Sequence, residues 1–456
     1  MLFDDLIQDQ PKEYDQEITM HGACLDYTFV ILDDGITGCQ TAHDVPVLFS
    51  WEPELLESTL GEKPHLIFII TNTRNRTREA AIGIIGDVMD KLNIAGDKSG
   101  RKIMVMSVMD SILHGHYPAE AEAIEACTEG EGTMQVLIPT CLAGDKFTCN
   151  DIHYVRDGET VIPVSWTSFV PDKEFMYRPS DLKEFVSEKY AGKIRPDQVL
   201  SFQIRELRLM GPENVKRRLL ESDARVCVVN ALAKSDLDVF ASGAWEAILA
   251  GKKILFSTAP SFINAFTCHP VKEPMERSAL KGEADRGGIV LVGSYDEISG
   301  GQLMQLMERG SAIPLGVDIQ GLLAGEEETI IASVVFRVRQ LIGRGKHVVI
   351  YTVFEPESLP ASNISRETGG RVAGIMAEIV SKIDPVPSFI IVKGEYTAYL
   401  TAIKGLKMER ATVTGQALPG VAVLVPGEIQ NLQYIIFPES SGEVDGLLDL
   451  FNMLTN

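Results

Sequence analysis

The stretch FVILDDGITGCQTAHD, residues 29–44, decides how this sequence is interpreted. Its apolar run includes the β-branched Val30 and Ile31 and stops at two adjacent carboxylates, Asp33 and Asp34. The pattern predicts a buried strand whose carboxyl end carries the acidic pair into a polar turn. Because ligands bind outside the carboxyl ends of strands in open α/β sheets, the pair is a candidate for ligating Mg²⁺, holding a polyol or taking a hydroxyl proton. An ordinary strand end with solvated acids is the alternative.

Length and charge exclude several classes of protein. A chain of 456 residues exceeds what one hydrophobic core usually supports, so we expect two domains. The net charge of −22, from 42 basic and 64 acidic residues, opposes binding to nucleic acid or to anionic lipid. An anionic substrate would therefore need a local basic pocket.

The cellular location is predicted from what the sequence lacks. No apolar run approaches the length of a membrane span, and the acidic first residues do not resemble a signal peptide. The seven cysteines are odd in number, scattered and without a CxxC pair. They indicate free thiols in a reducing cytoplasm rather than a disulfide framework or a zinc site.

Apolar runs alternate with amphipathic stretches along most of the chain, which predicts βα units. We expect two α/β domains with mainly parallel sheets and a cleft between them. A hairpin is expected at 151–164, with its turn at Asp157-Gly158. The expected strands are 28–32, 65–70, 102–108, 134–138, 225–229, 253–256, 289–292, 347–351, 388–392, 421–425 and 434–437, and the expected helices are 77–92, 235–249 and 326–345.

A break in the alternation divides the chain. Residues 268–288 are charged, contain two prolines and lack periodicity, which is typical of a linker. We therefore expect an N-terminal extension at 1–25, a first domain at 26–267 and a second domain at 289–456.

Two further strand ends in the first domain carry polar residues. Arg74, in the segment TNTRNR, can fork onto a carboxylate or phosphate, with a solvated loop as the alternative. Asp110 and Ser111 follow the strand at 102–108. His114 and His116 have a spacing seen in some metal sites, but no third ligand is nearby, so the metal content is left unknown. We expect Asp33, Asp34, Arg74 and Asp110 to converge.

The second domain has two strand ends of its own with glycine and hydroxyl residues. They are Gly293-Ser294-Tyr295 and Lys393-Gly394-Glu395-Tyr396-Thr397. Such turns can present backbone N–H groups to nucleotide phosphates, although neither matches a Walker or dinucleotide fingerprint. Ordinary βα turns are the alternative.

Taken in order, these segments resemble the four-carbon acid sugar kinase family, which phosphorylates acids such as threonate, erythronate and 3-oxo-tetronate with ATP. The similarity runs from Tyr27 to the C-terminus. The family's DDDPTGTQTVHDVPVL, TNSR and DSTLRGHFPxE are similar to LDDGITGCQTAHDVPVL at 32–48, TNTR at 71–74 and DSILHGHYPAE at 110–120. Shorter matches are HYV at 153–155, VVNA at 228–231, TAPSF at 258–262, GSY at 293–295 and LPGV at 418–421.

The resemblance implies a sugar-acid-binding domain at 26–267 and a nucleotide-binding domain at 289–456, with ATP and Mg²⁺ as cofactors. Asp33 and Asp34 would bind the substrate hydroxyl and act as base. The implied acid contacts are Arg74, Asp110, Ser111 and His114, and the implied nucleotide contacts are Gly293, Ser294, Lys393, Gly394, Thr397 and Gly442. Phosphoryl transfer needs positioning and charge neutralisation more than covalent help, which fits these residue types.

The sequence departs from the family pattern within the motifs that are implied to bind the acid and the nucleotide. Val108-Met109 stands where the family has a basic residue, His114 replaces the arginine of DSTLRG, and Trp166 replaces a glutamate. In the second domain Glu395, Glu439 and Glu443 stand where the pattern has glycine. Two like charges about 4 Å apart repel by about 4 kcal/mol at an effective dielectric of 20, or roughly three decades of affinity.

The leading interpretation is an ATP-dependent kinase of a small, four-carbon-type sugar acid. The alternative is a degenerate, non-catalytic homologue that binds a small acid or acts as a regulatory partner. A third hypothesis is an enzyme that kept the acid site but changed its donor or reaction. The particular acid, the hydroxyl phosphorylated and the oligomeric state, including a homo-oligomer, are left open.

Overall fold

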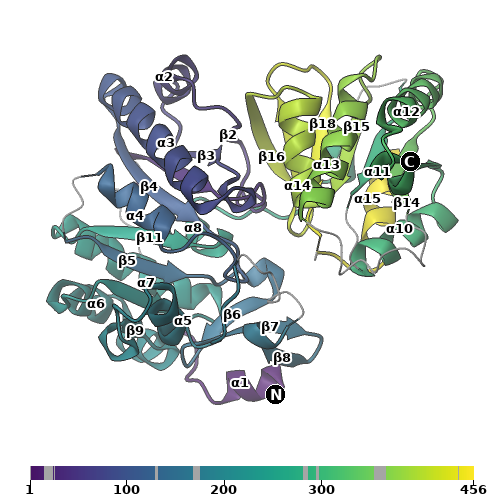
Figure 1. Cartoon of the computed structure of the whole chain (residues 1–456). Coiled ribbons are helices and arrows are strands. Elements are labelled where there is room, and N and C mark those ends of the chain that lie inside the picture. The colour runs from purple at the N-terminus through teal and green to yellow at the C-terminus, as the bar shows by residue number, and fades with distance from the viewer. Residues whose placement is uncertain are drawn as a thin grey trace. The chain divides into compact units, whose positions relative to one another are not determined.

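The protein forms two compact α/β units, which Figure 1 shows with their elements labelled. Unit 1 comprises Met1–Gly38 and Trp51–Pro270, and unit 2 comprises Cys39–Ser50 and Val271–Asn456. The sheets of both are mainly parallel, which confirms the predicted fold class. This computed structural model describes residues 2–14, 24, 26–128, 132–167, 175–280, 286–293, 297–353, 366–439 and 441–455.

The main sheet of unit 1 is parallel, in the order β3-β1-β4-β11-β5-β10-β9. Its central strand β1 is buried along nearly its whole length, as expected for an apolar run covered on both faces. Asp33, the last residue of β1, is in register with Ile70 of β3 and Val108 of β4, so these three strands end at one level. The strands are β1 (Tyr27–Asp33), β3 (Leu66–Ile70), β4 (Lys102–Val108), β5 (Met134–Ile138), β9 (Leu200–Phe202), β10 (Val226–Val229) and β11 (Ile254–Thr258).

Helices and a small antiparallel sheet complete unit 1. Helix α3 packs on α2 and α4, while α7 packs on α6 and α8. The predicted hairpin is present as β7 and β8, and its two turn residues are Gly158 and Glu159, one position later than the predicted Asp157-Gly158. The elements are α1 (Phe3–Gln8), α2 (Pro53–Gly61), α3 (Arg78–Ser99), α4 (Ala119–Ala126), α5 (Leu182–Lys189), α6 (Ile204–Glu221), α7 (Lys234–Leu249), α8 (Pro260–Thr267), β6 (Lys146–Cys149), β7 (Ile152–Asp157) and β8 (Thr160–Pro163), with 3₁₀ turns at Thr73–Asn75, Leu142–Gly144, Val164–Trp166 and Pro196–Gln198.

The sheet of unit 2 has a parallel half and an antiparallel half, in the order β13-β14-β12-β15-β18-β17-β16-β2. Strand β2 comes from the segment 39–50, directly after the acidic motif, and pairs antiparallel with β16. The strands are β2 (Val45–Leu48), β12 (Ile289–Val292), β13 (Ile313–Asp318), β14 (Val348–Val353), β15 (Phe389–Lys393), β16 (Arg410–Leu418), β17 (Val421–Pro426) and β18 (Gln433–Phe437). The helices are α9 (Arg277–Leu280), α10 (Glu297–Arg309), α11 (Ile319–Leu323), α12 (Glu327–Ile342), α13 (Arg366–Ser381), α14 (Glu395–Leu400) and α15 (Gly446–Thr455), with a π-helical turn at Thr401–Gly405.

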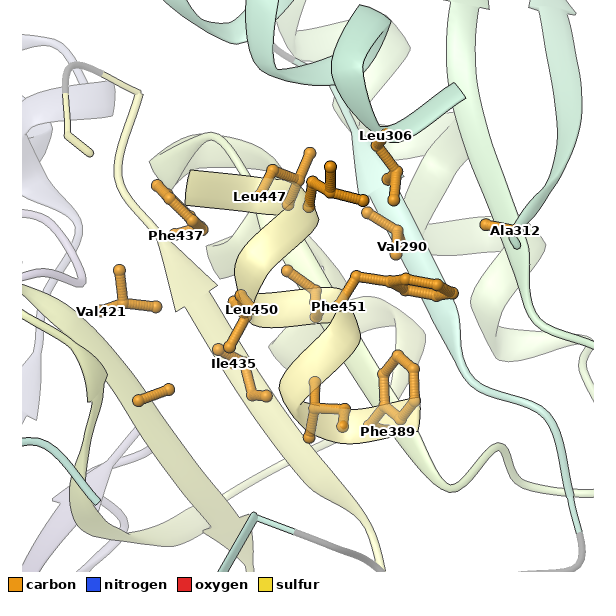
Figure 2. Packing of buried hydrophobic residues seen from close by; sticks show 14 of the residues in the cluster. Val290, Leu306, Ala312, Phe389, Val421, Ile435, Phe437, Leu447, Leu450 and Phe451 are labelled. Atoms are coloured by element: carbon orange, nitrogen blue, oxygen red, sulfur yellow. The ribbon is translucent and has the colours of Figure 1, made fainter. Parts of the chain in front are cut away.

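The C-terminal helix α15 anchors the core of unit 2. Its Leu447, Leu450 and Phe451 are fully buried, and Figure 2 shows them facing side chains of the sheet such as Phe389 and Ile435. Burying a side chain of this size contributes about 1.5–3 kcal/mol. This core therefore fixes the carboxyl ends of β15 and β18, where the candidate nucleotide residues lie. In the ranges given above, no helix has both the length and the apolarity to cross a membrane.

Candidate functional site

Three strand ends bring the predicted acid-site residues of unit 1 together. The backbone N–H of Thr71, after β3, donates to the Asp33 carbonyl at 2.9 Å, and the N–H of Asp34 donates to the Val108 carbonyl at 3.4 Å. The N–H of Arg74 donates to the Asp34 carbonyl at 3.2 Å. These main-chain bonds hold the turns after β1, β3 and β4 against one another.

Asp33 organises the turn that follows it. Its Oδ1 accepts from the N–H of Gly35 at 3.1 Å, and its Oδ2 accepts from the N–H of Gly38 at 2.8 Å. A Cβ at Gly38 would lie 2.6 Å from Oδ2, so glycine is required there. Burial and the neighbouring Asp34 raise the pKa of Asp33 to about 7, against the two N–H donors and Arg74. Asp33 is thus a buried carboxyl group that titrates near neutral pH.

Asp34 and Asp110 share Arg74. The guanidinium donates to Asp34 Oδ1 at 2.7 Å through one terminal nitrogen and to Asp110 Oδ2 at 3.1 Å through the other. The expected convergence of the acid-site residues is therefore confirmed. Asp34 is 2% exposed, and burial raises its pKa although Arg74 opposes the shift. Its Oδ2 has no hydrogen-bond partner among the described residues, and a Cβ at Gly115 would lie 3.1 Å away.

His153 supports the turn after β4. The Nε2–H of this histidine donates to the Ser111 carbonyl at 2.7 Å, and its Nδ1 lies 2.9 Å from the Thr148 hydroxyl. Burial lowers the pKa of His153 to about 4, so the ring is neutral and its Nδ1 accepts. The HYV motif therefore supports the loop that carries Asp110 and Ser111.

His114 lies in an aromatic environment. Its buried ring is 5.9 Å from the ring of Phe175 and 6.4 Å from that of Tyr177. Across the part of the chain that the structure describes, no cluster of three or more His, Cys, Asp or Glu side chains could hold a metal ion.

Glu120 lies close to Asp34 and Arg74 and was not among the predicted site residues. It lies in the first turn of α4 and is 6% exposed. Burial and the charge of Asp34 raise its pKa to about 8. The only signal in the sequence is its place at the end of DSILHGHYPAE, because acids in a helix such as AEAEAIEA usually face solvent.

In unit 2, Lys393 at the end of β15 is completely buried. Its ammonium donates to the Pro438 carbonyl at 2.7 Å and to the Ser441 carbonyl at 3.3 Å. It also lies 4.2 Å from the centre of the Phe437 ring. The side chain predicted to contact a nucleotide thus supports the loop after β18.

Gln302 of α10 supports the same loop and was not predicted. Its Nε2 donates to the carbonyls of Ser441, Gly442 and Glu443 at 3.1, 3.2 and 2.8 Å. Gly442 has a φ of +82°, which favours glycine. No isolated motif identifies a glutamine on a helix more than a hundred residues away as a loop support.

The other predicted nucleotide residues lie at the ends of β12 and β15. A Cβ at Gly293 would be 2.3 Å from Thr397 Oγ1, and Gly394 has a φ of +113°, so both positions require glycine. Ser294 lies outside the described residues. Glu395 is half-buried, whereas Glu439 and Glu443 are exposed.

Comparisons with known proteins agree with this two-part organisation. Residues 29–266 match a family model described as a sugar-binding N-terminal domain, and residues 289–447 match one described as a nucleotide-binding C-terminal domain. Because these matches span most of the chain, the protein belongs to the four-carbon acid sugar kinase family. A comparison with curated proteins finds no match.

Solved structures share the fold at low identity. A protein from Haemophilus influenzae is 14% identical, with 94% of this chain and 100% of its own covered, and a TM-score of 0.62. A putative tRNA synthase from Salmonella typhimurium LT2 is also 14% identical, with 93% and 98% covered, and a TM-score of 0.68. At this identity the likenesses show the fold alone.

Proposed function

We propose that this protein is a kinase that transfers a phosphoryl group from ATP to a hydroxyl group of a small, four-carbon-type sugar acid. The observation that carries the proposal is Asp34, which has one oxygen fixed by Arg74 and the other without a partner in the described part of the chain. A buried acceptor of this kind costs free energy unless a donor reaches it. A substrate hydroxyl is such a donor, and its proton is the one that transfer must remove.

Each residue of the acid site has a role in this proposal. Asp34 accepts the hydroxyl proton. Asp33 fixes the turn that follows β1 by accepting from the N–H groups of Gly35 and Gly38. Arg74 orients Asp34 and is the cation closest to it, so we assign it the carboxylate of the acid. Asp110, Ser111 and His114 line the same loop and complete the acid contacts.

The nucleotide would be held by the strand ends of unit 2. Gly293, Gly394 and Gly442 let main chain approach a phosphate closely, which side chains at these positions would prevent. Thr397 supplies a hydroxyl beside Gly293. Mg²⁺ would neutralise phosphate charge, and we assign it no protein ligand set.

A non-catalytic homologue that still binds a small acid is the second candidate, and Lys393 favours it. An ammonium that already serves two carbonyls is a weaker phosphate ligand than one that points into an open site. The three glutamates at glycine positions act in the same direction, because they add negative charge near the phosphates.

Replacing the proposed base tests the kinase hypothesis. We expect Asp34→Asn to lower phosphoryl transfer to threonate, erythronate or 3-oxo-tetronate by about 10²–10⁴-fold, because the general base is lost. Release of ADP measures the transfer, and Asp90→Asn on the exposed face of α3 is the matched control. If the unaltered protein binds both Mg-ATP and an acid yet transfers nothing, the non-catalytic alternative holds.

A further inference from the structure

The N-terminal segment, residues 2–14, is docked on unit 1 although it lies outside both family matches. It begins with α1, and Figure 1 shows α1 beside β7 and β8. Leu2 forms an antiparallel bridge with Thr160 of β8, and the N–H of Phe3 donates to the Glu159 carbonyl at 2.9 Å. The first residues of the segment therefore extend the small sheet of β6, β7 and β8.

Apolar side chains of α1 cover one face of this small sheet. Leu6 is 4% exposed and shares an apolar cluster with Phe147 and Val161. The centre of the Phe3 ring lies 4.9 Å from that of Phe147, and the Arg156 guanidinium lies 4.3 Å from the centre of the Phe3 ring. Burial of these side chains holds α1 on the sheet.

The second half of the N-terminal segment is held by α6. Arg208 donates to the Pro11 carbonyl at 2.8 Å through one nitrogen and to the Asp236 carboxylate at 2.7 and 2.9 Å through the other two. Because Arg208 is buried, the Pro11 carbonyl satisfies a donor that water does not reach freely. A Cβ at Gly211 would lie 2.6 Å from the Tyr14 hydroxyl oxygen, so Tyr14 lies directly against the main chain of α6.

The opposite face of the small sheet supports the acid site. Because successive side chains of a strand alternate between faces, His153 and Val155 lie on the face that is turned away from α1. His153 donates to the Ser111 carbonyl at 2.7 Å, and Val155 shares an apolar cluster with Ile112 and Leu113. The sheet therefore lies between α1 and the loop after β4.

We propose that the N-terminal segment positions the loop after β4 through the small sheet, and so raises the affinity of the acid site. A small antiparallel sheet is stable only when its apolar face is covered, and α1 supplies part of that cover. A sheet that loses this cover would hold Asp110 and Ser111 less firmly, and binding would then include the cost of ordering them. Only the statement about affinity rests on the proposed function.

Leu6→Asp tests the proposal in the full chain, because a buried carboxylate would detach α1 from the sheet. We expect hydrogen exchange of the Leu113 amide to become about tenfold faster, while exchange of the Thr71 amide after β3 stays unchanged. Both amides donate to main-chain carbonyls at 2.9 Å, so the comparison is matched. Ile7→Asp puts the same charge on the exposed side of α1 and should alter neither rate.

The pattern of exchange decides the outcome. Equal acceleration of both amides would mean that unit 1 is loosened as a whole, and no acceleration of Leu113 would mean that its loop does not depend on the N-terminal segment. Either result overturns the proposal. If Leu6→Asp does not fold, Phe3→Ala removes a ring without burying a charge, and it must still accelerate Leu113 alone, by about threefold.

A double variant tests the route through the sheet. When His153→Leu has already released the Ser111 carbonyl, Leu6→Asp should add much less to the exchange rate of Leu113 than it does in the wild type. Fully additive effects would overturn the route, because they would show that α1 and His153 act on the loop independently.

Calorimetry with erythronate separates this inference from the proposed function. We expect Leu6→Asp to weaken binding about three- to tenfold and Ile7→Asp to leave it unchanged. If even the wild type binds no acid while exchange accelerates only at Leu113, the proposed function fails and the positioning of the loop stands. Wild-type affinity in Leu6→Asp, with α1 shown by its own fast exchange to be detached, would overturn the proposed effect of the segment on the acid site.

Discussion

Arg74 of unit 1 and Lys393 of unit 2 both lie where a parallel strand ends, yet their partners differ. Arg74 binds two carboxylates on neighbouring turns, and one of these, Asp34, keeps an oxygen without a partner among the described residues. Lys393 binds main-chain carbonyls of the loop after β18 and is completely buried. The difference teaches that a cation at a strand end indicates a ligand site only when the atoms around it leave hydrogen-bonding capacity for a ligand.

The contrast between Arg74 and Lys393 would not hold if Lys393 did not stabilise the loop after β18. We expect Lys393→Met to lower the free energy of unfolding of unit 2 by about 2–4 kcal/mol, because the buried Pro438 carbonyl loses its ammonium donor and the Ser441 carbonyl keeps only Gln302. Urea unfolding followed by hydrogen exchange within unit 2 measures this loss. Lys404→Met, at an exposed lysine close in sequence, should change little. A stable Lys393→Met variant that had lost only nucleotide affinity would instead assign the ammonium to the ligand.

Arg74→Ala tests whether Arg74 in unit 1 binds the sugar acid. We expect it to weaken binding of a sugar acid by about 1.5–3 kcal/mol, the range for a charge-assisted hydrogen bond. Thermal-shift screening of acids with four to six carbons, followed by calorimetry, measures the change. Arg76→Ala is a fair control, because Arg76 is exposed on the same loop. Acid binding untouched by Arg74→Ala would place the acid elsewhere.

Local sequence patterns predicted the bounds of strands better than which strands pair with one another. The strands at 102–108 and 134–138 have the predicted bounds, because their apolar runs are bounded by polar or turn residues. The stretch that predicted β1, residues 29–44, is followed directly by β2, whose pairing with β16 more than 350 residues later no local pattern indicates. The short, alternately exposed edge strand β13 was not predicted, since its apolar signal is weak.

The candidate site shows the same limit. Asp33, Asp34, Arg74 and Asp110 could be predicted together because parallel strands end on one edge. The burial of Glu120 and the hydrogen bonds of Lys393 to main-chain carbonyls follow from tertiary packing. Their sequence neighbourhoods, a charged helix and a glycine-containing turn, do not reveal either property.

The smallest expected effect concerns the three glutamates that stand at glycine positions in unit 2. The pattern alone suggests a loss of roughly three decades in ATP affinity. Glu439 and Glu443 are exposed, so solvent screens their charges and their side chains can turn away from a phosphate. We therefore expect restoring glycine at 395, 439 and 443 to raise Mg-ATP affinity by about tenfold or less, with most of the gain from the half-buried Glu395.

Calorimetry with Mg-ATP at two salt concentrations distinguishes the physical causes of that gain. If charge repulsion dominates, the gain shrinks as the salt concentration rises, because mobile ions screen exposed carboxylates. If the glutamate at 395 obstructs the approach of a phosphate, Glu395→Gly alone reproduces the gain and salt leaves it unchanged. A gain of three decades would contradict the screening argument, and it would mean that the exposed glutamates lie against the phosphates when the nucleotide binds. No gain at all would leave the engagement of Lys393 by its own loop as the main obstacle to nucleotide binding in unit 2.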